Sequence, residues 1–187
     1  DTLLGRLRNT LAKHLSTHPK NYIALNKGIV SLENSYSDIE DFFDNCEAGF
    51  NHARREEFWQ AGNRFNEALQ LWKGSLPTDT FRNDSVFSYE DVLVATFEKM
   101  SLTWAQILSD AERQQEAIPL LTRLLQTNPL AENAVILLCK LYTATYQAVK
   151  IRETLDTYKK ALQNAEYENE EIDEMIEGVI KTLEDKP

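Results

Sequence analysis

The sequence WAQILSDAERQQEAIPLLTRLLQTNP, residues 104–129, decides the fold of this 187-residue chain. Apolar residues recur every three or four positions on both sides of a polar segment at residues 110–114, which predicts two helices joined by a tight turn. The small side chains of Ala105 and Ala117 allow the two backbones to approach closely. Pro129 follows the second helix, where a proline cannot continue it. The stretch therefore predicts a pair of antiparallel helices.

The same helical periodicity continues on both sides of this pair. We expect helices near residues 37–53, 55–73, 88–110, 114–127, 130–145, 148–164 and 169–184, with a long loop over residues 74–88. Alanine at the helix crossing and proline after the second helix, repeated every 34 residues or so, are typical of tetratricopeptide arrays. Ala68 occupies the crossing position one pair earlier, whereas Ile151 stands there one pair later. The predicted fold class is all-α, a tetratricopeptide-like helical-repeat superhelix of about three irregular pairs.

Large aromatic side chains supply the predicted core between the helix pairs. They are Trp59, Trp72, Trp104, Phe58, Phe65 and Tyr142. A groove that binds a peptide is the alternative interpretation of this set. The acidic stretch from residue 166 to residue 177 alternates with Ile172, Met175 and Ile176, so it predicts an amphipathic helix with a solvated acidic face that closes the array.

The first 35 residues have a different pattern. Leu3, Leu7, Leu11 and Leu15, with Leu4, form an apolar stripe of a short helix. Gly5, Arg6, Asn9 and Lys13 project from the opposite side of that helix, and Arg8 lies on its flank. Two short apolar runs at residues 22–25 and 29–32, separated by Asn26-Lys27-Gly28, then predict a β-hairpin.

Charge divides the chain at the same place. The net charge of −10 argues at first against a nucleic-acid partner. Residues 1–35, however, carry five basic and two acidic residues, a net of +3, whereas residues 36–187 carry a net of −13. We therefore expect two domains, 1–35 and 36–187, with different partners.

The sequence argues against several classes of function. The six glycines are at least twelve residues apart, so no phosphate-binding loop or dinucleotide motif is present, and we expect neither catalysis nor a cofactor. His14 and His18 lack further ligands, so we expect no metal site. Cys46 and Cys139 are expected to be buried, reduced thiols of a cytoplasmic protein. No apolar run is long enough to span a bilayer, so no membrane partner is expected.

Five short stretches carry a resemblance to a known family. They are SDIEDF (residues 37–42), EALQLWKGSLP (67–77), EAIPLL (116–121), NPLAE (128–132) and LDTY (155–158). Together the segment from Ser37 to about Asn164 resembles the bacterial transcriptional activator domain of regulators of the antibiotic regulatory protein type. In that family the helical module follows a winged-helix DNA-binding domain.

The resemblance implies a role for the first 35 residues. They resemble the last part of a winged helix, with the recognition helix around Arg6-Leu7-Arg8 and the wing at residues 22–32. The side chains that would then contact DNA are Arg6, Arg8, Asn9, Lys13 and Lys27. Because the chain begins at Asp1 within a helical pattern, we expect it to be part of a longer protein and to bind DNA weakly or not at all by itself.

The function expected from the sequence is thus bacterial transcriptional regulation. A complete winged helix would bind promoter DNA, and the helical module would mediate self-association or receive a signal from a protein partner. The alternative is a tetratricopeptide-like adaptor that binds another protein and never contacts DNA.

Overall fold

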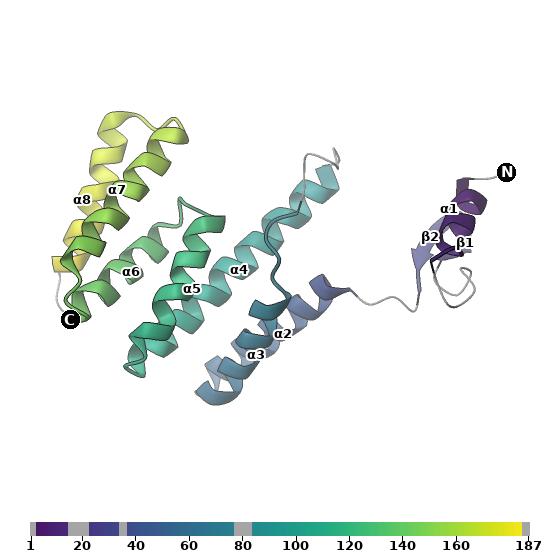
Figure 1. Ribbon diagram of the computed structural model, residues 1–187, viewed down its shortest axis with the longest axis horizontal. Helices are drawn as coiled ribbons and strands as arrows, with labels where there is room; N and C mark the ends of the chain where they lie inside the picture. The colour runs from purple at the N-terminus through teal and green to yellow at the C-terminus, as the bar shows by residue number, and fades with distance from the viewer. Residues whose placement is uncertain (1–2, 15–22, 34–36, 77–83, 185–187) are drawn as a thin grey trace. The chain divides into compact units, whose positions relative to one another are not determined.

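The computed structural model in Figure 1 describes residues 3–14, 23–33, 37–76 and 84–184, with the side chains of α4 described from Ser88 onward. The chain forms two compact units, Asp1–Glu40 and Asp41–Pro187. The first holds a helix and a hairpin, and the second holds the helical repeats.

The first unit contains the predicted helix and hairpin. Helix α1 (Leu3–Leu11) precedes strands β1 (Ile23–Asn26) and β2 (Ile29–Leu32). The strands are antiparallel, and Asn26 pairs with Ile29. Lys27 and Gly28 between them have φ values of 51° and 84°, because a two-residue turn that matches the twist of the strands needs positive φ at both positions. The turn conformation therefore falls on Lys27 and Gly28, and Asn26 still belongs to the first strand.

The second unit consists of three helix pairs and a final helix. The pairs are α2 (Asp38–Arg54) with α3 (Phe58–Leu71), α4 (Asp84–Asp110) with α5 (Gln114–Thr127), and α6 (Glu132–Ala144) with α7 (Ala148–Asn164); α8 (Asn169–Glu184) follows. From α3 onward each helix contacts the next, and α6 also contacts α8 (Figure 1). The predicted all-helical repeat fold is confirmed, although α4 begins four residues earlier, and α3 three residues later, than the sequence indicated.

The turns that close α2, α4, α6 and α7 share one backbone conformation. A residue just after each helix has φ between 57° and 63°, namely Glu56, Glu112, Tyr146 and Glu166. The next N–H donates to the carbonyl five positions earlier, as Arg113 N does to Leu108 O at 2.8 Å. This is the Schellman motif, which usually has glycine at the left-handed position. Glu112 and Tyr146 are 34 residues apart, in agreement with the repeat length expected from the sequence.

Aromatic rings join the first helix pair to the second. Trp72, directly after α3, stacks on Phe97 of α4 with ring centroids 4.0 Å apart and planes 3° from parallel. Phe65 of α3 is fully buried, and its ring centroid lies 6.1 Å from that of Trp104 on α4. Stacked and tilted ring pairs at these distances add to the free energy gained from burial alone.

Two glycines make room for these rings. A Cβ atom at Gly49 of α2 would stand 2.5 Å from Cδ1 of Phe65, and one at Gly62 of α3 would stand 2.9 Å from Cζ2 of Trp104. Both separations are far below van der Waals contact. The missing side chains therefore set how closely α2 approaches α3, and α3 approaches α4.

Arg123 of α5 binds the end of α3. Its Nη2 donates to the Trp72 carbonyl oxygen at 2.7 Å, and its Nη1 donates to that of Leu69 at 3.4 Å. Carbonyl groups in the last turn of a helix lack partners within the helix and form the negative end of its dipole. The guanidinium of a residue in the second helix pair thus binds carbonyl groups at the end of the first pair.

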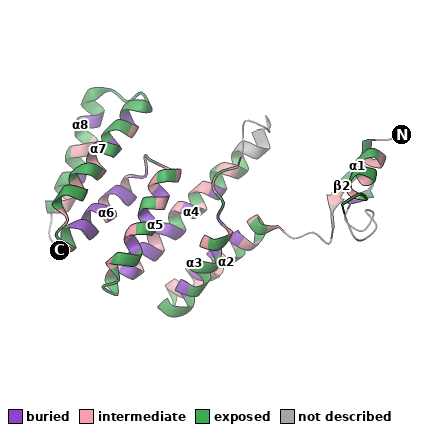
Figure 2. Cartoon of the chain, in the orientation of Figure 1, coloured by how far each residue is buried: buried purple, intermediate pink, exposed green. Residues whose placement is uncertain are grey.

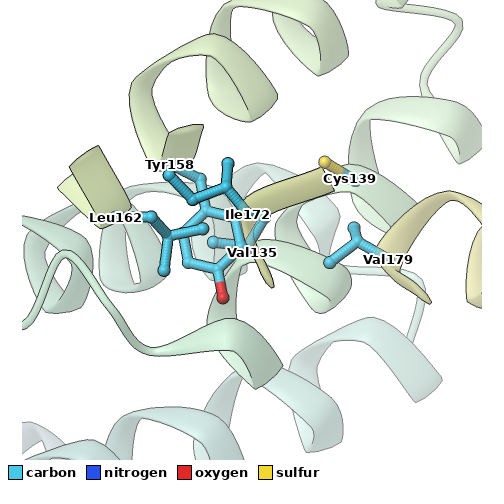
Figure 3. Packing of buried hydrophobic residues seen from close by; sticks show 6 residues of the cluster. All are labelled: Val135, Cys139, Tyr158, Leu162, Ile172 and Val179. Atoms are coloured by element: carbon cyan, nitrogen blue, oxygen red, sulfur yellow. The ribbon is translucent and has the colours of Figure 1, made fainter. Parts of the chain in front are cut away.

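The end of the array has its own core, shown in Figure 3. Six buried residues from three helices meet there: Val135 and Cys139 of α6, Tyr158 and Leu162 of α7, and Ile172 and Val179 of α8. The acidic residues of α8 lie on its exposed side. The predicted amphipathic helix with a solvated acidic face is confirmed, and it packs on α6 and α7.

Two aromatic residues predicted as core lie largely outside it. Trp59 is 76% exposed and Phe58 is 49% exposed, whereas the other four of the predicted set are buried. The buried side of α3 contains Ala61, Phe65 and Ala68 (Figure 2). Phe58 lies on that side but at the first helical position, and Trp59 lies about 100° further round the helix. Trp59 therefore projects to solvent.

Both cysteines are buried and free. Burial raises the pKa of the Cys46 thiol to about 12 and that of the Cys139 thiol to about 11. Both therefore stay protonated at neutral pH, as expected for structural thiols without nucleophilic reactivity.

We expect alanine at two helical glycines to have opposite effects. Gly62→Ala should lower the free energy of unfolding by about 1 to 2 kcal/mol, because overpacking against Trp104 outweighs the gain in helix propensity. Gly178→Ala in α8 is the matched control, since a Cβ there meets nothing within 4 Å. It should raise the free energy of unfolding by roughly 0.5 to 1 kcal/mol. Urea unfolding followed by circular dichroism measures both, and two changes of the same sign would contradict the packing described here.

The buried thiols predict a dependence of stability on pH. Their pKa values are raised above the ordinary 9.0, so the stability present below about pH 9 should fall as the pH rises from there toward the folded values. Tyr158, with its pKa raised to about 12 chiefly by burial, acts in the same direction. Neither thiol should react with Ellman's reagent near pH 8 until urea unfolds the chain. Rapid reaction of the native protein would contradict this.

Candidate functional site

Three of the residues predicted to contact DNA lie on α1 or just after it. Arg6, Asn9 and Lys13 are all exposed. Arg6 and Asn9 are three residues apart and so lie on the same side of α1. Lys13 lies in the turn that follows the helix, which ends at Leu11.

Lys27 lies at the tip of the hairpin in the same unit. It is exposed and holds the left-handed conformation of the turn. Lysine is unusual there, since asparagine, aspartate or glycine adopts that conformation at lower cost. The turn thus presents a lysine side chain at a position where the left-handed backbone conformation favours asparagine, aspartate or glycine.

Arg8 lies differently from the other predicted contact residues. It is half-buried, and its Nη2 donates to the carbonyl oxygen of Ile23 at 2.7 Å. Its Nε is buried with no hydrogen-bond partner. Arg8 therefore links α1 to β1 through one hydrogen bond.

The apolar side of α1 also differs from the predicted leucine stripe. Leu3 is 85% exposed and Leu7 is 47% exposed. Leu4, Arg8 and Leu11 are half-buried instead, so the side of α1 that faces the unit is rotated from the predicted stripe. Leu15 and His18 lie outside the described residues. The rotation follows from Arg8, which has to face β1 to reach the Ile23 carbonyl.

Much apolar surface of the first unit is open to solvent. On the hairpin, Leu25, Ile29 and Val30 are exposed. Among the residues of this unit whose burial is described, Ile23 alone is buried. The described part of this unit therefore buries little apolar surface with which to offset the entropy of folding.

The described ranges hold no cluster of three or more His, Cys, Asp or Glu side chains placed to bind a metal ion. His52 pairs with Glu57 across the turn between α2 and α3, with Nδ1 and Oε2 2.5 Å apart. In those same ranges, none of the helices combines the length and the hydropathy that a membrane crossing needs.

Sequence reasoning missed two features of the second unit. One is Arg123, whose hydrogen bonds to Trp72 and Leu69 span more than fifty residues of sequence and leave no local pattern. The other is the exposure of Trp59, which a count of apolar residues assigns to the core.

Comparisons with known proteins agree with this architecture. The model of the bacterial transcriptional activator domain matches residues 37–171. No curated protein sequence matches the chain. Among solved structures, EmbR from Mycobacterium tuberculosis, in a complex with a low-affinity phosphopeptide, superposes with a TM-score of 0.66 at 19% identity. That match covers 95% of this chain and 48% of EmbR, so the chain spans about half of EmbR's length.

A second solved structure shares the fold. It is the C-terminal tetratricopeptide-containing domain of an FK506-binding protein from Plasmodium falciparum, with a TM-score of 0.52 at 18% identity. The match covers 80% of this chain and 95% of that domain. These likenesses show a tetratricopeptide-like fold, and the family model, which matches most of the chain, shows its membership. The chain belongs to the bacterial transcriptional activator domain family, a family of transcriptional regulators.

Proposed function

We propose that this chain is the part of a cytoplasmic transcriptional regulator in which the first unit contacts promoter DNA and the second unit receives protein input or self-associates. The observation that carries the proposal is the match to the activator-domain family at residues 37–171, directly after a basic unit with a helix and a hairpin. We place a domain boundary at residues 35 and 36, where the net charge changes sign.

The DNA contacts we propose are Arg6, Asn9, Lys13 and Lys27. Arg6 and Asn9 share the exposed face of α1, and Lys13 follows the end of that helix. A helix of this kind fits the major groove with its long polar side chains toward the base edges. Lys27 at the hairpin tip supplies a phosphate contact. Arg8 acts as a positioning residue, because its hydrogen bond to Ile23 fixes the helix to the hairpin.

The acidic second unit is compatible with DNA binding by the first. The Debye length at physiological salt is about 8 Å, so acidic groups held two such lengths from the duplex repel it little. At shorter range they discourage the helical repeats from lying on DNA non-specifically. The charge distribution therefore favours one orientation of the chain toward a duplex.

The adaptor alternative also has an observation in its favour. The exposed Leu3, Leu7 and Ile29 are apolar groups that a protein surface could cover as readily as further elements of a winged helix. In that case the basic face of α1 would be an ordinary solvated helix face.

The test uses the full-length protein that contains this chain. Selection from a random duplex library gives its preferred site, and gel-shift titration over a range of salt concentrations gives the affinity. Lys27→Asn should leave the hairpin intact, because asparagine tolerates positive φ, and should lower the slope of log affinity against log salt by about one. Asn9→Ala should cost about 1 to 3 kcal/mol and relax the preference at one base pair.

Lys160→Asn is the matched control, since it removes one charge from an exposed position of α7. It should leave the salt dependence unchanged. DNA binding that is unaffected by Lys27→Asn and Asn9→Ala would overturn the proposed contacts. Full-length protein that selects no DNA sequence at all would favour the adaptor. The isolated chain should bind the selected site far more weakly than the full-length protein, because its first unit buries so little.

A further inference from the structure

Two hollows lie along α3 on the surface of the second unit. The first, of about 250 Å³, lies between the start of α3 and the end of α4, with Trp59, Gly62 and Trp104 in its walls. The second, of about 710 Å³, lies at the end of α3 beside Lys73 and Arg123. Asn66 lines both hollows. We name the two hollows together the α3 groove.

One part of the α3 groove is aromatic. Trp59 and Phe58, the two aromatic residues that the core leaves exposed, both line its first hollow. A tryptophan that is 76% exposed beside a hollow gains burial as soon as an apolar side chain enters. This part of the groove therefore fits a bulky apolar anchor.

The middle of the groove is lined by amide side chains. Asn63, Asn66 and Gln70 are exposed along α3. Each amide supplies both donors and an acceptor, so it can pair with a peptide backbone in either direction. The row of amides is suited to an extended chain lying along α3.

The charge of the groove is opposite to that of the unit around it. Lys73, Arg113 and Arg123 line it, and none of its described lining residues is acidic, although residues 36–187 carry a net charge of −13. Lys73 Nζ donates to the Gln70 carbonyl oxygen at 2.9 Å, and an ammonium has two more donors. Arg113 pairs with Glu116, but both side chains are more than half exposed, and such pairs exchange partners at little cost.

Another hollow of the second unit lacks this combination. It lies between α5, α6 and α7, has a volume of about 270 Å³, and contains Lys150 together with Glu153, joined by an ion pair of 2.7 Å. Both of its lining tyrosines, Tyr142 and Tyr158, are buried. The α3 groove thus differs from this hollow in its exposed aromatic residues and in the absence of a carboxylate among its described lining residues.

We propose that the α3 groove binds an acidic peptide segment of a partner protein, with a bulky apolar side chain seated against Trp59 and Phe58 and carboxylates facing Lys73 and Arg113. The proposal rests on the protein input proposed above and names the partner's chemistry. A DNA duplex fits this surface poorly, because the surrounding unit repels phosphates. Arg123 contributes charge but is also held by the end of α3, so it serves as a structural group of the groove.

Fluorescence anisotropy on the full chain tests the proposal. The probe is a fluorescein-labelled peptide of about twelve residues, rich in aspartate and glutamate with a central Leu-Phe pair. We expect a Kd of roughly 1 to 100 μM that rises with salt, and no binding of the same peptide with lysine at every acidic position. Trp59→Ala and Lys73→Glu should each weaken binding about tenfold or more. Far-UV circular dichroism checks that both variants, at exposed positions, remain folded.

Lys150→Glu in the hollow between α5, α6 and α7 is the matched control and should leave the affinity unchanged. Equal binding of the lysine-rich peptide, or equal loss on Lys150→Glu, would overturn the proposal. A peptide of residues 166–180 from this chain could instead bind more tightly than the acidic probe, with a concentration-dependent rise in mass by light scattering. That result would overturn the proposal and identify a second copy of this chain as the occupant of the groove. Loss of duplex binding on Trp59→Ala would also overturn the proposal and identify DNA as the ligand of the groove. Because the acidic-peptide titrations do not test the proposed contacts of the first unit with DNA, those contacts can fail while this proposal stands, and the reverse also holds.

Discussion

The stacking of Trp72 on Phe97, with Phe65 against Trp104 beside it, is the contact on which the second unit depends. It joins the first helix pair to the rest of the array. The neighbouring Phe65 and Trp104 rings fit because Gly49 and Gly62 present no side chain to them. Arg123 adds a charge-assisted link at the same junction. The close approach of α3 to α4 also shapes the α3 groove, since Gly62 leaves the Trp104 ring as part of the groove wall. Core packing and surface recognition thus share one set of residues.

Much of the helical fold could be predicted from the sequence because its signals are local. Alternation of apolar and polar positions gave α5, α7 and α8 with their observed bounds. The remaining bounds shifted where a turn competes with helix propensity. Glu56 adopts a left-handed conformation that delays the start of α3 to Phe58, and glutamate gives no indication of such a turn, whereas glycine would have.

The candidate DNA-binding face was predictable in part. Arg6, Asn9 and Lys13 are polar at helical spacing, and their exposure follows from that pattern alone. The role of Arg8 does not follow from the pattern, because leucines at positions 3, 4, 7 and 11 allow more than one side of α1 to face the hairpin. The choice between these faces depends on a carbonyl fifteen residues away. Trp59 was assigned to the core by its aromatic character, whereas its position around α3, away from Phe65 and Ala68, turns it toward solvent.

The matching turns after α4 and α6 have a consequence for how such a chain can change in length. Glu112 and Tyr146 have the same backbone conformation in equivalent turns, 34 residues apart. The chain therefore runs in the same direction relative to the array at both ends of the segment between them. Duplication of that segment would lengthen the array by one whole helix pair without a new kind of junction. The constraint falls on the faces of the added helices, which have to match their neighbours, rather than on the connections between them.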